Sequence, residues 1–342
     1  MIRGKIISFT AQGAKTGERV AQSLSDCCAE RYARGVDASL NQTKLSRMVQ
    51  QAMADCDLIV FVGATGIAVR MCAPFLKGKQ YDPAVLVIDE QARFVISLLS
   101  GHLGGANALA QQIAEGIGAQ PVITTATDGR GAFAVDTWAK AHGCTVHEVD
   151  RIKYISGAIL SGKPVGFQSD FPILGALPDG IGAQGESGIV LSVRLTNTPF
   201  SNTLHLIPRL VTLGIGCRRG TEQQAITQAV SRILQEEQIP WSAIRTVASI
   251  DIKKDELGIC AFCQQHALPF VTYTAQELRE TPGQYTASAF VQHTVGVDNV
   301  CERAAIRASE NGQLLRAKTS CGGITIALAV HDWEVVLSLI HI

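Results

Sequence analysis

The chain has 342 residues, 46% of them hydrophobic and 18% charged, and its formal net charge is zero. This composition indicates well-packed globular domains and argues against a nucleic-acid-binding protein, which needs a cluster of phosphate-pairing cations. The sequence holds no uncharged apolar run long enough to cross a bilayer and opens without the apolar stretch of a signal peptide, so we expect a cytoplasmic protein with no membrane partner.

Ten cysteines are scattered along the chain. In a reducing compartment such residues are typically buried thiols rather than disulfides. The CxxC pair, Cys260 and Cys263, has no second pair at zinc-binding spacing and falls inside a predicted helix. We therefore expect this pair to serve packing, with a metal or redox role as the less favoured alternative, and we predict no metal site.

The first predicted elements alternate between strand and helix. KIISFT and DLIVFVG are strand-like runs, and LSRMVQQAMADC has the spacing of an amphipathic helix. After the second strand, the turn GATG leads into a helix that we expect to start at Ile67, with Arg70 in its first turn. The backbone N–H of Gly66 and the Arg70 guanidinium would suit a carboxylate there, although an arginine on a helix is as often only solvated.

A hairpin is predicted next, where two apolar runs flank the polar turn DEQA at residues 89–92. Its strands run antiparallel, so the turn lies at the opposite end of RFVISLL from the loop SGHLGG, which follows that strand. Asp89 and Glu90 look like paired catalytic carboxylates, but this geometry makes them turn residues.

The stretch from Arg93 to Asp128 reads as strand, loop, helix, strand and loop. RFVISLL and PVITT are buried-type strands, and ANALAQQIAE between them has helical spacing. Such a βαβ unit has parallel strands, so the loops SGHLGG and ATDGRG emerge at one edge of the sheet, where open α/β sheets bind ligands. The side chains expected to converge there are His102, Asn107, Thr124, Thr125 and Asp128.

Residues 151–207 differ in character, with recurring Gly and Pro among short β-rich runs and no recognisable chemistry. From Leu210 strands and helices alternate again, with capping boxes predicted at Thr221–Gln224 and Thr274–Glu277. We predict an α/β fold with two α/β domains of largely parallel sheets, at residues 1–138 and 208–342. A small β-rich middle region at residues 139–207 joins them.

Two turns of the second α/β domain carry charged residues at strand ends. GIGCRRGT places Arg218 and Arg219 between a strand and a helix N-terminus, and SIDIKKDE places Asp251 and Lys253 at the end of the next strand. Each turn alone is more often a solvated loop. Because the strands are expected to be parallel, the two turns share an edge, which then suits a carboxylate-rich molecule.

Several of these stretches together resemble a known family. SGHLGGAN followed by ITTATD, and preceded by VGATGIAVRMCAP and DPAVLVIDE, resembles the N-terminal half of the cobalt-precorrin-5A hydrolase (CbiG) family. TLGIGCRRGT, VASIDIKKDE, VGVDNVCERAA and LLRAKTSCGGITIALA resemble its C-terminal domain, which is also found separately as CobE. The resemblance runs from residue 50 to residue 330, with the motifs in the expected order, and leaves the tail VHDWEVVLSLIHI without a role.

The resemblance implies a reaction of the anaerobic route to cobalamin (vitamin B12). The substrate is a ring-contracted cobalt tetrapyrrole that carries a δ-lactone. Water opens the lactone, and the extruded two-carbon unit leaves as acetaldehyde to give cobalt-precorrin-5B. Such an enzyme is a hydrolase that acts on a carbon–carbon bond. The cobalt belongs to the substrate, so no cofactor is expected in the protein.

Lactone opening needs a base for water and donors for the developing oxyanion. His102 is the candidate base, acid or cobalt contact, with a structural loop role as the alternative. Asp128 could orient His102 or act as the base itself, and Asn107 is a third catalytic candidate or a helix cap. The candidates for substrate binding are loop residues and cations that would pair the substrate's carboxylates: Gly66, Arg70, Gly104, Gly105, Thr124, Thr125, Arg218, Arg219, Asp251 and Lys253.

A second hypothesis is a non-catalytic tetrapyrrole-binding or carrier protein of the same pathway, because no nucleophile in the sequence excludes it. A nucleotide-binding α/β enzyme is disfavoured. The chain lacks both a GxGxxG with its downstream acidic residue and a GxxxxGK followed by Ser or Thr. Exposed strand edges would also allow a homodimer.

Overall fold

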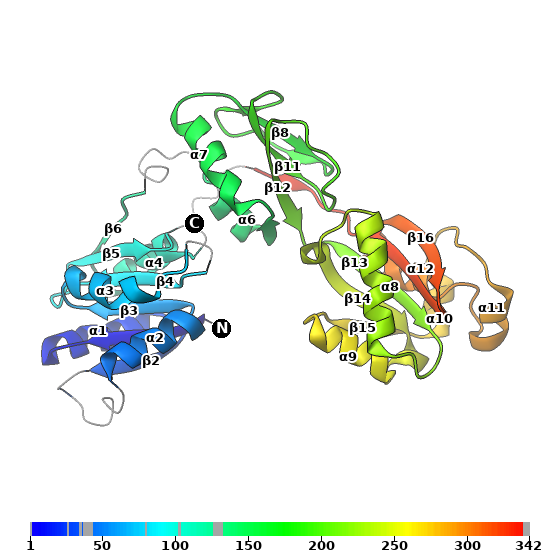
Figure 1. Ribbon diagram of the computed structural model, residues 1–342, viewed down its shortest axis with the longest axis horizontal. Coiled ribbons are helices and arrows are strands. Elements are labelled where there is room, and N and C mark those ends of the chain that lie inside the picture. Colours follow the sequence, from blue (N-terminus) through cyan, green and yellow to red (C-terminus); the bar gives the residue numbers. More distant parts are fainter. Residues whose placement is uncertain are drawn as a thin grey trace. The chain divides into compact units, whose positions relative to one another are not determined.

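The structure is a computed structural model that describes residues 2–25, 27–33, 36, 44–78, 81–101, 104–125 and 133–337. Contacts divide the chain into two compact units, Met1–Thr137 and Trp138–Ile342, whose elements are shown in Figure 1. Among the described helices, none has both the length and the hydropathy that crossing a bilayer requires. The expected α/β class with largely parallel sheets is confirmed.

The first unit is built on a six-stranded sheet with the order β2-β1-β3-β4-β5-β6. Four of its strands run parallel to one another, namely β1 (Ile2–Ser8), β2 (Cys27–Ala33), β3 (Leu58–Val62) and β4 (Ala84–Ile88). β5 (Phe94–Leu99) is antiparallel to β4, as the predicted hairpin requires, and β6 (Gln120–Val122) is parallel to β5. The last two strands therefore point the opposite way from the first four.

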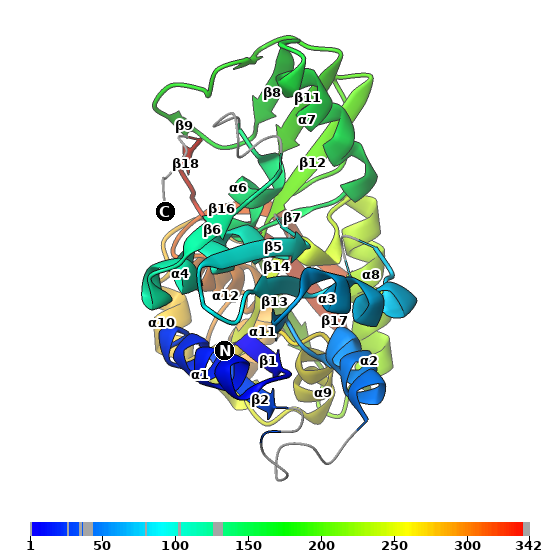
Figure 2. The ribbon, with the colours of Figure 1, turned by 90° about the vertical axis from the view of Figure 1, so that its left-hand side faces the viewer.

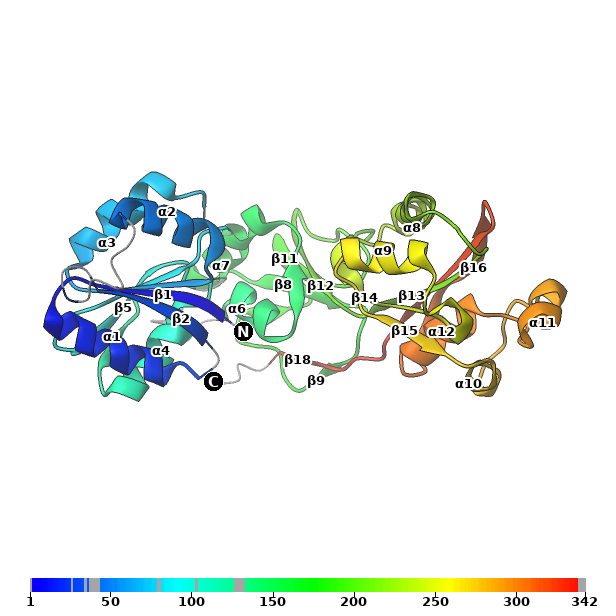
Figure 3. The same ribbon diagram turned by 90° about the horizontal axis from the view of Figure 1, so that it is seen from below.

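Helices cover both faces of this sheet (Figure 3). α1 (Ala11–Ser23) and α4 (Ala106–Ile117) lie on one face, and α2 (Leu45–Asp55) and α3 (Thr65–Cys72) on the other. Alternate residues of β3 serve the two cores: Val60 packs in the core that includes α1 and α4, and Phe61 in the core that includes α2 and α3. Burial on both faces explains why the strands are continuously apolar rather than alternating.

The second unit begins with a five-stranded sheet in the order β10-β8-β11-β12-β7. These strands are β7 (Cys144–Val146), β8 (Val165–Ser169), β10 (Ile181–Gly182), β11 (Ser187–Leu191) and β12 (Asn202–Pro208). α6 (Val135–Ala141) precedes it, and α7 (Ile152–Leu160) contacts β8, β11 and β12. The prediction of only β-rich runs here missed α7, although Ile152, Ile155 and Ile159 have helical spacing.

A second five-stranded sheet, in the order β15-β14-β13-β17-β16, forms the rest of this unit. β13 (Val211–Cys217), β14 (Ile244–Ile250) and β15 (Phe270–Tyr273) are parallel, whereas β16 (Gln313–Cys321) and β17 (Ile324–Val330) form an antiparallel hairpin beside β13. The covering helices are α8 (Gln223–Glu236) and α9 (Leu257–Gln265) on one face, and α12 (Cys301–Ala308), with α10 (Ala275–Glu280) beside it, on the other (Figure 3).

One glycine lets α12 approach this sheet closely. A Cβ atom on Gly214 of β13 would lie 1.8 Å from the carbonyl oxygen of Cys301. The first turn of α12 therefore rests directly on the strand backbone, which any side chain at residue 214 would prevent.

The tail that follows β17 joins the two sheets of the second unit. β18 (Val335–Val336) pairs in parallel with β9 (Ile173–Leu174), a short strand beside the middle sheet (Figure 2). Trp138 Nε1 donates to the carbonyl of Val336 at 3.1 Å, and the Trp333 ring packs edge-on against Phe171. The tail, to which the sequence assigned no role, is thus a structural link.

Candidate functional site

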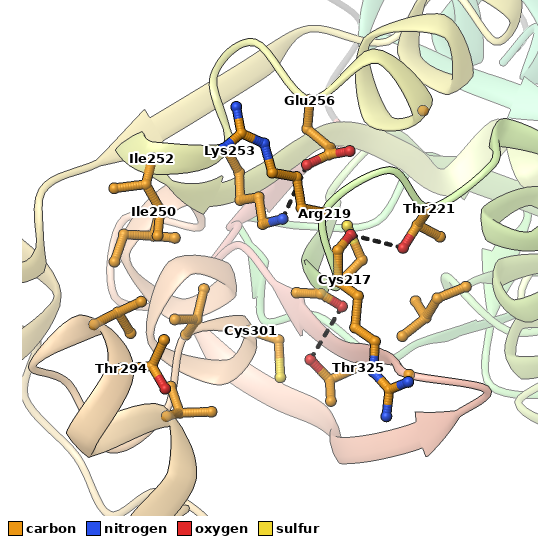
Figure 4. Close-up of a pocket in the computed structure, with 18 of the residues that line it drawn as sticks. Cys217, Arg219, Thr221, Ile250, Ile252, Lys253, Glu256, Thr294, Cys301 and Thr325 are labelled. Carbon is orange, nitrogen blue, oxygen red and sulfur yellow. Dashed lines mark hydrogen bonds and ion pairs between the residues drawn. The ribbon is translucent and has the colours of Figure 1, made fainter.

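A cavity of about 1290 Å³ opens at the carboxyl ends of β13 and β14 (Figure 4). Its walls come from the turns after these strands, the start of α9, the β16–β17 hairpin and α11 (Ala289–Val295). Sites for drug-sized ligands measure roughly 300–1,000 Å³. The cavity therefore has room for a larger ligand, and it lies at the edge where α/β sheets bind their ligands.

Two adjacent arginines line this cavity. Arg218 and Arg219 follow β13 in a turn that ends at Gly220, and both side chains are exposed. Within the part of the chain that the structure describes, no carboxylate forms an ion pair with either guanidinium. Both groups are thus available to a carboxylate of a ligand, which a guanidinium can bind through two parallel hydrogen bonds.

Lys253 lies at the same edge, as the parallel pairing of β13 and β14 predicts, but its charge is already matched. Its Nζ donates to Glu256 Oε2 at 2.9 Å, and the other oxygen of this carboxylate accepts from the Gly220 N–H at 2.7 Å (Figure 4). The hydrogen bond from Lys253, opposed by partial burial, holds the pKa of Glu256 below its usual range. Glu256 therefore ties the two turns together, while Asp251 begins a short 3-10 turn outside the cavity lining.

The turn after β13 differs from the sequence prediction in one respect. Thr221 does not cap α8, whose N-cap is Glu222 without a side-chain hydrogen bond. Instead the Thr221 hydroxyl donates to the Arg218 carbonyl at 2.7 Å, which closes the turn that carries both arginines. The predicted capping box at Thr274 and Glu277 is confirmed.

Two cysteines in the cavity wall are poor nucleophiles. Burial raises the pKa of the Cys301 thiol to about 12, and burial also raises the pKa of Cys217 above its ordinary value. Both groups are therefore neutral thiols near pH 7, and a thiolate mechanism has no support here. Across the described ranges, no three His, Cys, Asp or Glu side chains are grouped as a metal site.

Glu302 organises another wall of the cavity and escaped the sequence prediction. This carboxylate is 1% exposed and accepts from the Thr286 N–H and hydroxyl, from Asn299 Nδ2 and from the Lys318 N–H, at 2.6–2.9 Å. Asn299 and Lys318 both line the cavity. A charged residue on the buried face of a predicted helix, in VDNVCERAA, is the signal that could have revealed this role.

In the first unit, two of the side chains expected to converge, those of Asn107 and Thr125, are in contact. Asn107 is buried at the second position of α4; its amide accepts from the Ser97 hydroxyl at 2.6 Å and donates to the Thr125 hydroxyl at 3.0 Å. Its side chain does not cap α4, whose N-cap is Gly105 in the left-handed conformation. Asn107 thus links β5 to the residues that directly follow β6. Thr124 beside it is exposed, and His102 and Asp128 lie outside the described residues.

Gly104, which follows β5, lies very close to Ser100. A Cβ atom on Gly104 would lie 2.3 Å from the Ser100 Cβ and 2.7 Å from the Ser100 carbonyl oxygen. The loop can fold back on Ser100 in this way only with glycine at residue 104. The fold-back also lets the Ser100 and Gly101 carbonyls accept from the Ala106 and Asn107 N–H groups, at 3.1 Å and 3.0 Å, at the start of α4.

The structure separates Gly66 and Arg70 from the residues that follow β5. Because β5 is antiparallel to β4, the carboxyl end of β3 lies at the opposite edge of the sheet from the carboxyl end of β5. Gly63 there donates to the Ile88 carbonyl, next to the hairpin turn. α3 starts at Thr65 rather than Ile67, so Arg70 is in its last turn, with Nη1 3.5 Å from the Gly66 carbonyl oxygen.

Asp89 is the turn residue that the sequence predicted. Its carboxylate accepts from the Arg93 N–H at 2.8 Å and from the Phe94 N–H at 2.7 Å. Partial burial alone would raise the pKa of Asp89, but these hydrogen bonds hold it below its usual range. The carboxylate thus closes the β4–β5 hairpin.

Comparison with known proteins identifies the family. Three family models match in succession: Cobalamin synthesis G N-terminal at residues 47–128, Cobalamin biosynthesis central region at 133–208, and Cobalamin synthesis G C-terminus at 211–329. Cobalt-precorrin-5A hydrolase of Salmonella typhimurium strain LT2 is 38% identical over 82% of this chain and 84% of its own length.

Two further relatives agree with this match. Cobalt-precorrin-5A hydrolase of Priestia megaterium is 30% identical over 96% of this chain and 95% of its own. Protein CobE of Sinorhizobium sp is 31% identical over 34% of this chain and 77% of its own length. With all three segments present in order and a relative at 38% identity across most of both lengths, the chain belongs to the cobalt-precorrin-5A hydrolase (CbiG) family.

Proposed function

We propose that this chain is a cobalt-precorrin-5A hydrolase of cobalamin biosynthesis. The observation that carries this proposal is the match to relatives of that name through the N-terminal, central and C-terminal segments alike. A carrier related to CobE would need only the C-terminal segment, because CobE matches only about a third of the chain. The N-terminal unit is therefore expected to serve the chemistry.

The cavity of the second unit supports binding of the substrate. A cobalt tetrapyrrole combines a large macrocycle with several carboxylate side chains, so its site needs volume, apolar surface and cations. The cavity offers about 1290 Å³, the exposed guanidiniums of Arg218 and Arg219, and apolar side chains such as Ile250 and Val300. Cobalt enters with the substrate, and the proposal requires no resident cofactor.

The proposed chemistry begins when water adds to the lactone carbonyl and the ring C–O bond breaks. This step leaves an alcohol, whose alkoxide takes up the proton that water gave to the base, and a carboxylic acid, which releases water's second proton to solvent and becomes a carboxylate. The alcohol then becomes acetaldehyde as its carbon–carbon bond to the macrocycle breaks, and the macrocycle keeps the electron pair and gains a proton. His102 is the proposed base, with Asp128 as its partner, and Gly104 and Gly105 would donate N–H groups to the oxyanion.

Asn107 acts in this proposal as a positioning residue rather than a catalytic one, because Ser97 and Thr125 already engage its amide. Thr124, the exposed sequence neighbour of Thr125, would bind substrate. We also propose a cytoplasmic location, which is supported by free thiols at all ten cysteine positions.

The test is acetaldehyde release from cobalt-precorrin-5A, with the wild type and His102→Ala both shown to be folded. Release by the wild type and binding without release by the variant would support both the reaction and the role of His102. Equal release by both proteins would keep the hydrolase and remove His102 from the mechanism. A wild type that binds the pigment and releases nothing is a carrier.

A further inference from the structure

The cavity of the second unit gathers exposed apolar side chains that a folded protein normally buries. Leu257 is 83% exposed, Phe290 78% and Ile252 65%, and all three line this cavity. Of the described large apolar side chains, only Tyr81, in the other unit, has a comparable exposure, at 68%. Such a concentration of exposed apolar surface at one cavity marks a binding surface.

α11 contributes to this surface and little to the core. None of its residues is buried. Phe290, Val291, Thr294 and Val295 line the cavity, while Gln292 and His293 do not. The lining positions are spaced one helical turn apart, so one face of the helix is turned toward the cavity.

The segments that lead into and out of α11, called here its incoming and outgoing stems, are nevertheless held by hydrogen bonds. Glu302, buried at the base, accepts from Thr286 on the incoming stem, and Asn299 on the outgoing stem donates to the Thr286 carbonyl at 2.9 Å. The Ser288 N–H donates to the Asp298 carbonyl at 2.9 Å and so joins the stems. The helix is therefore held at both ends. Val295, at its last position, packs against the core that includes Ile250 and Leu278, whereas Phe290, at its other end, remains 78% exposed.

Ile252, after β14, and Leu257, at the first position of α9, line the same cavity as α11 (Figure 4 labels Ile252 and Thr294). The exposed side chains of Arg218 and Arg219 line the same cavity. The acidic side chains of Glu222 and Asp255 also line it, and the acidic Glu256 is engaged by Lys253. The cavity thus offers apolar walls beside a pair of guanidiniums, which together complement a flat apolar ring with carboxylates at its rim.

We propose that these walls form an apolar clamp, made of Ile252, Leu257, Phe290, Val291 and Val295, that grips the faces of the tetrapyrrole ring. Arg218 and Arg219 pair with the ring's carboxylates at the cavity mouth. This inference rests on the proposed function for the identity of the ligand and adds the means by which it is held. Phe290 is then a specificity-determining contact, because it strengthens binding of a macrocycle, which has a ring face to contact, and not of a polycarboxylate without one.

Two probes separate the clamp from the arginines. Uroporphyrin III has a flat ring and rim carboxylates, whereas mellitate (benzenehexacarboxylate) is a compact polycarboxylate without a macrocycle. In fluorescence and calorimetric titrations of the full chain, Phe290→Ala and Ile252→Ser should each weaken uroporphyrin binding roughly 10- to 100-fold and leave mellitate unchanged. The R218Q/R219Q variant should weaken binding of both probes. Tyr154→Ala, an exposed aromatic residue on α7, is the matched control and should change neither.

Parallel assays keep this inference distinct from the proposed function. If Phe290→Ala binds uroporphyrin like the wild type and retains its KM for acetaldehyde release, the clamp is overturned and the hydrolase stands. If the wild type releases no acetaldehyde while uroporphyrin binding depends on Phe290, the clamp stands and the hydrolase fails. If Phe290→Ala leaves uroporphyrin affinity intact but dissociates a dimer in sedimentation, the surface joins two copies and the clamp is overturned.

Discussion

The carboxylate of Glu256 holds Lys253 with one oxygen and the Gly220 N–H with the other, at 2.9 Å and 2.7 Å. The interaction links the turn after β13 to the turn after β14, and both turns line the cavity. Glu256 is 9% exposed, so both hydrogen bonds are partly shielded from water. Glu256 thereby fixes the distance between the turn that carries Arg218 and Arg219 and the turn after β14.

Glu256→Gln should lower the free energy of unfolding by about 1–2 kcal/mol, because the amide nitrogen that replaces one carboxylate oxygen cannot accept a hydrogen bond and the remaining oxygen carries no charge. The lowered pKa of Glu256 means that its stabilising effect is present above the unfolded value of 4.5 and is lost as the pH falls through the folded value. Urea denaturation at neutral and acid pH checks this expectation. A difference between wild type and variant that does not shrink in acid would contradict it.

His331 should make the free energy of unfolding depend on pH in a second range, closer to neutral pH than that of Glu256. It is 4% exposed, and its Nε2 lies 3.3 Å from the Thr212 hydroxyl. Burial, aided by Arg245 and opposed by Glu310 and Asp332, lowers the pKa of His331 below its ordinary 6.5.

The unfolded chain therefore binds a proton at a pH at which folded His331 does not. Stability should decline as the pH falls from about 7 through 6.5 toward the folded-state pKa. His331→Gln should flatten this part of the profile. Parallel profiles for wild type and variant in thermal denaturation would refute the assignment.

In the tail, a charged substitution should destabilise the protein at Val335 but be tolerated at the next residue, Val336. Val335 is fully buried, whereas its neighbour Val336 is 38% exposed on the same strand. Val335→Asp should cost about 3–5 kcal/mol, because it buries an unpaired charge, and Val336→Asp should stay within about 0.5 kcal/mol of the wild type. Equal unfolding midpoints for the two variants would argue that β18 does not pack as described.

Gly104→Ala should lower kcat for acetaldehyde release roughly 10- to 100-fold, because the added Cβ moves the loop off Ser100 and misplaces its donors. Gly157→Ala is the matched control: its Cβ would meet nothing within 4 Å on α7, and the change should stabilise the helix slightly. Both proteins should show the wild-type circular dichroism spectrum. An active Gly104→Ala variant would remove this loop from the proposed chemistry.

Local patterns predicted the elements whose residues face a core. The parallel order of β13 and β14 follows from strands that alternate with helices, and it correctly placed Arg218 and Lys253 at one edge. α11 was not predicted, because it has only seven residues and its apolar side chains line the cavity rather than fill a core. Nothing near Glu256 in the sequence indicates that its carboxylate reaches the Gly220 N–H, 36 residues away.

The β4–β5 hairpin was predicted correctly, but its effect on the positions of the candidate binding residues was not. Two apolar runs around DEQA predicted the antiparallel pairing of β4 and β5, and the structure confirms it. That reversal also places Arg70 and Gly104 at opposite edges of the sheet, so they do not form one binding site in the first unit. The consequence appears only when all six strands are ordered together, which depends on long-range contacts that periodicity does not report.

The pairing of β18 with β9 means that the backbone connects the two sheets of the second unit twice, once between β12 and β13 and once through the tail. A protease that cut the short link between β12 and β13 would therefore leave a nicked protein rather than two separate fragments. The hydrogen bond from Trp138 to Val336 and the packing of Trp333 on Phe171 would keep the pieces together. Contacts outside the tail would also hold the pieces, among them the ion pair of Arg194 with Glu237 and the packing of Val193 and Ile207 in the core of the C-terminal sheet.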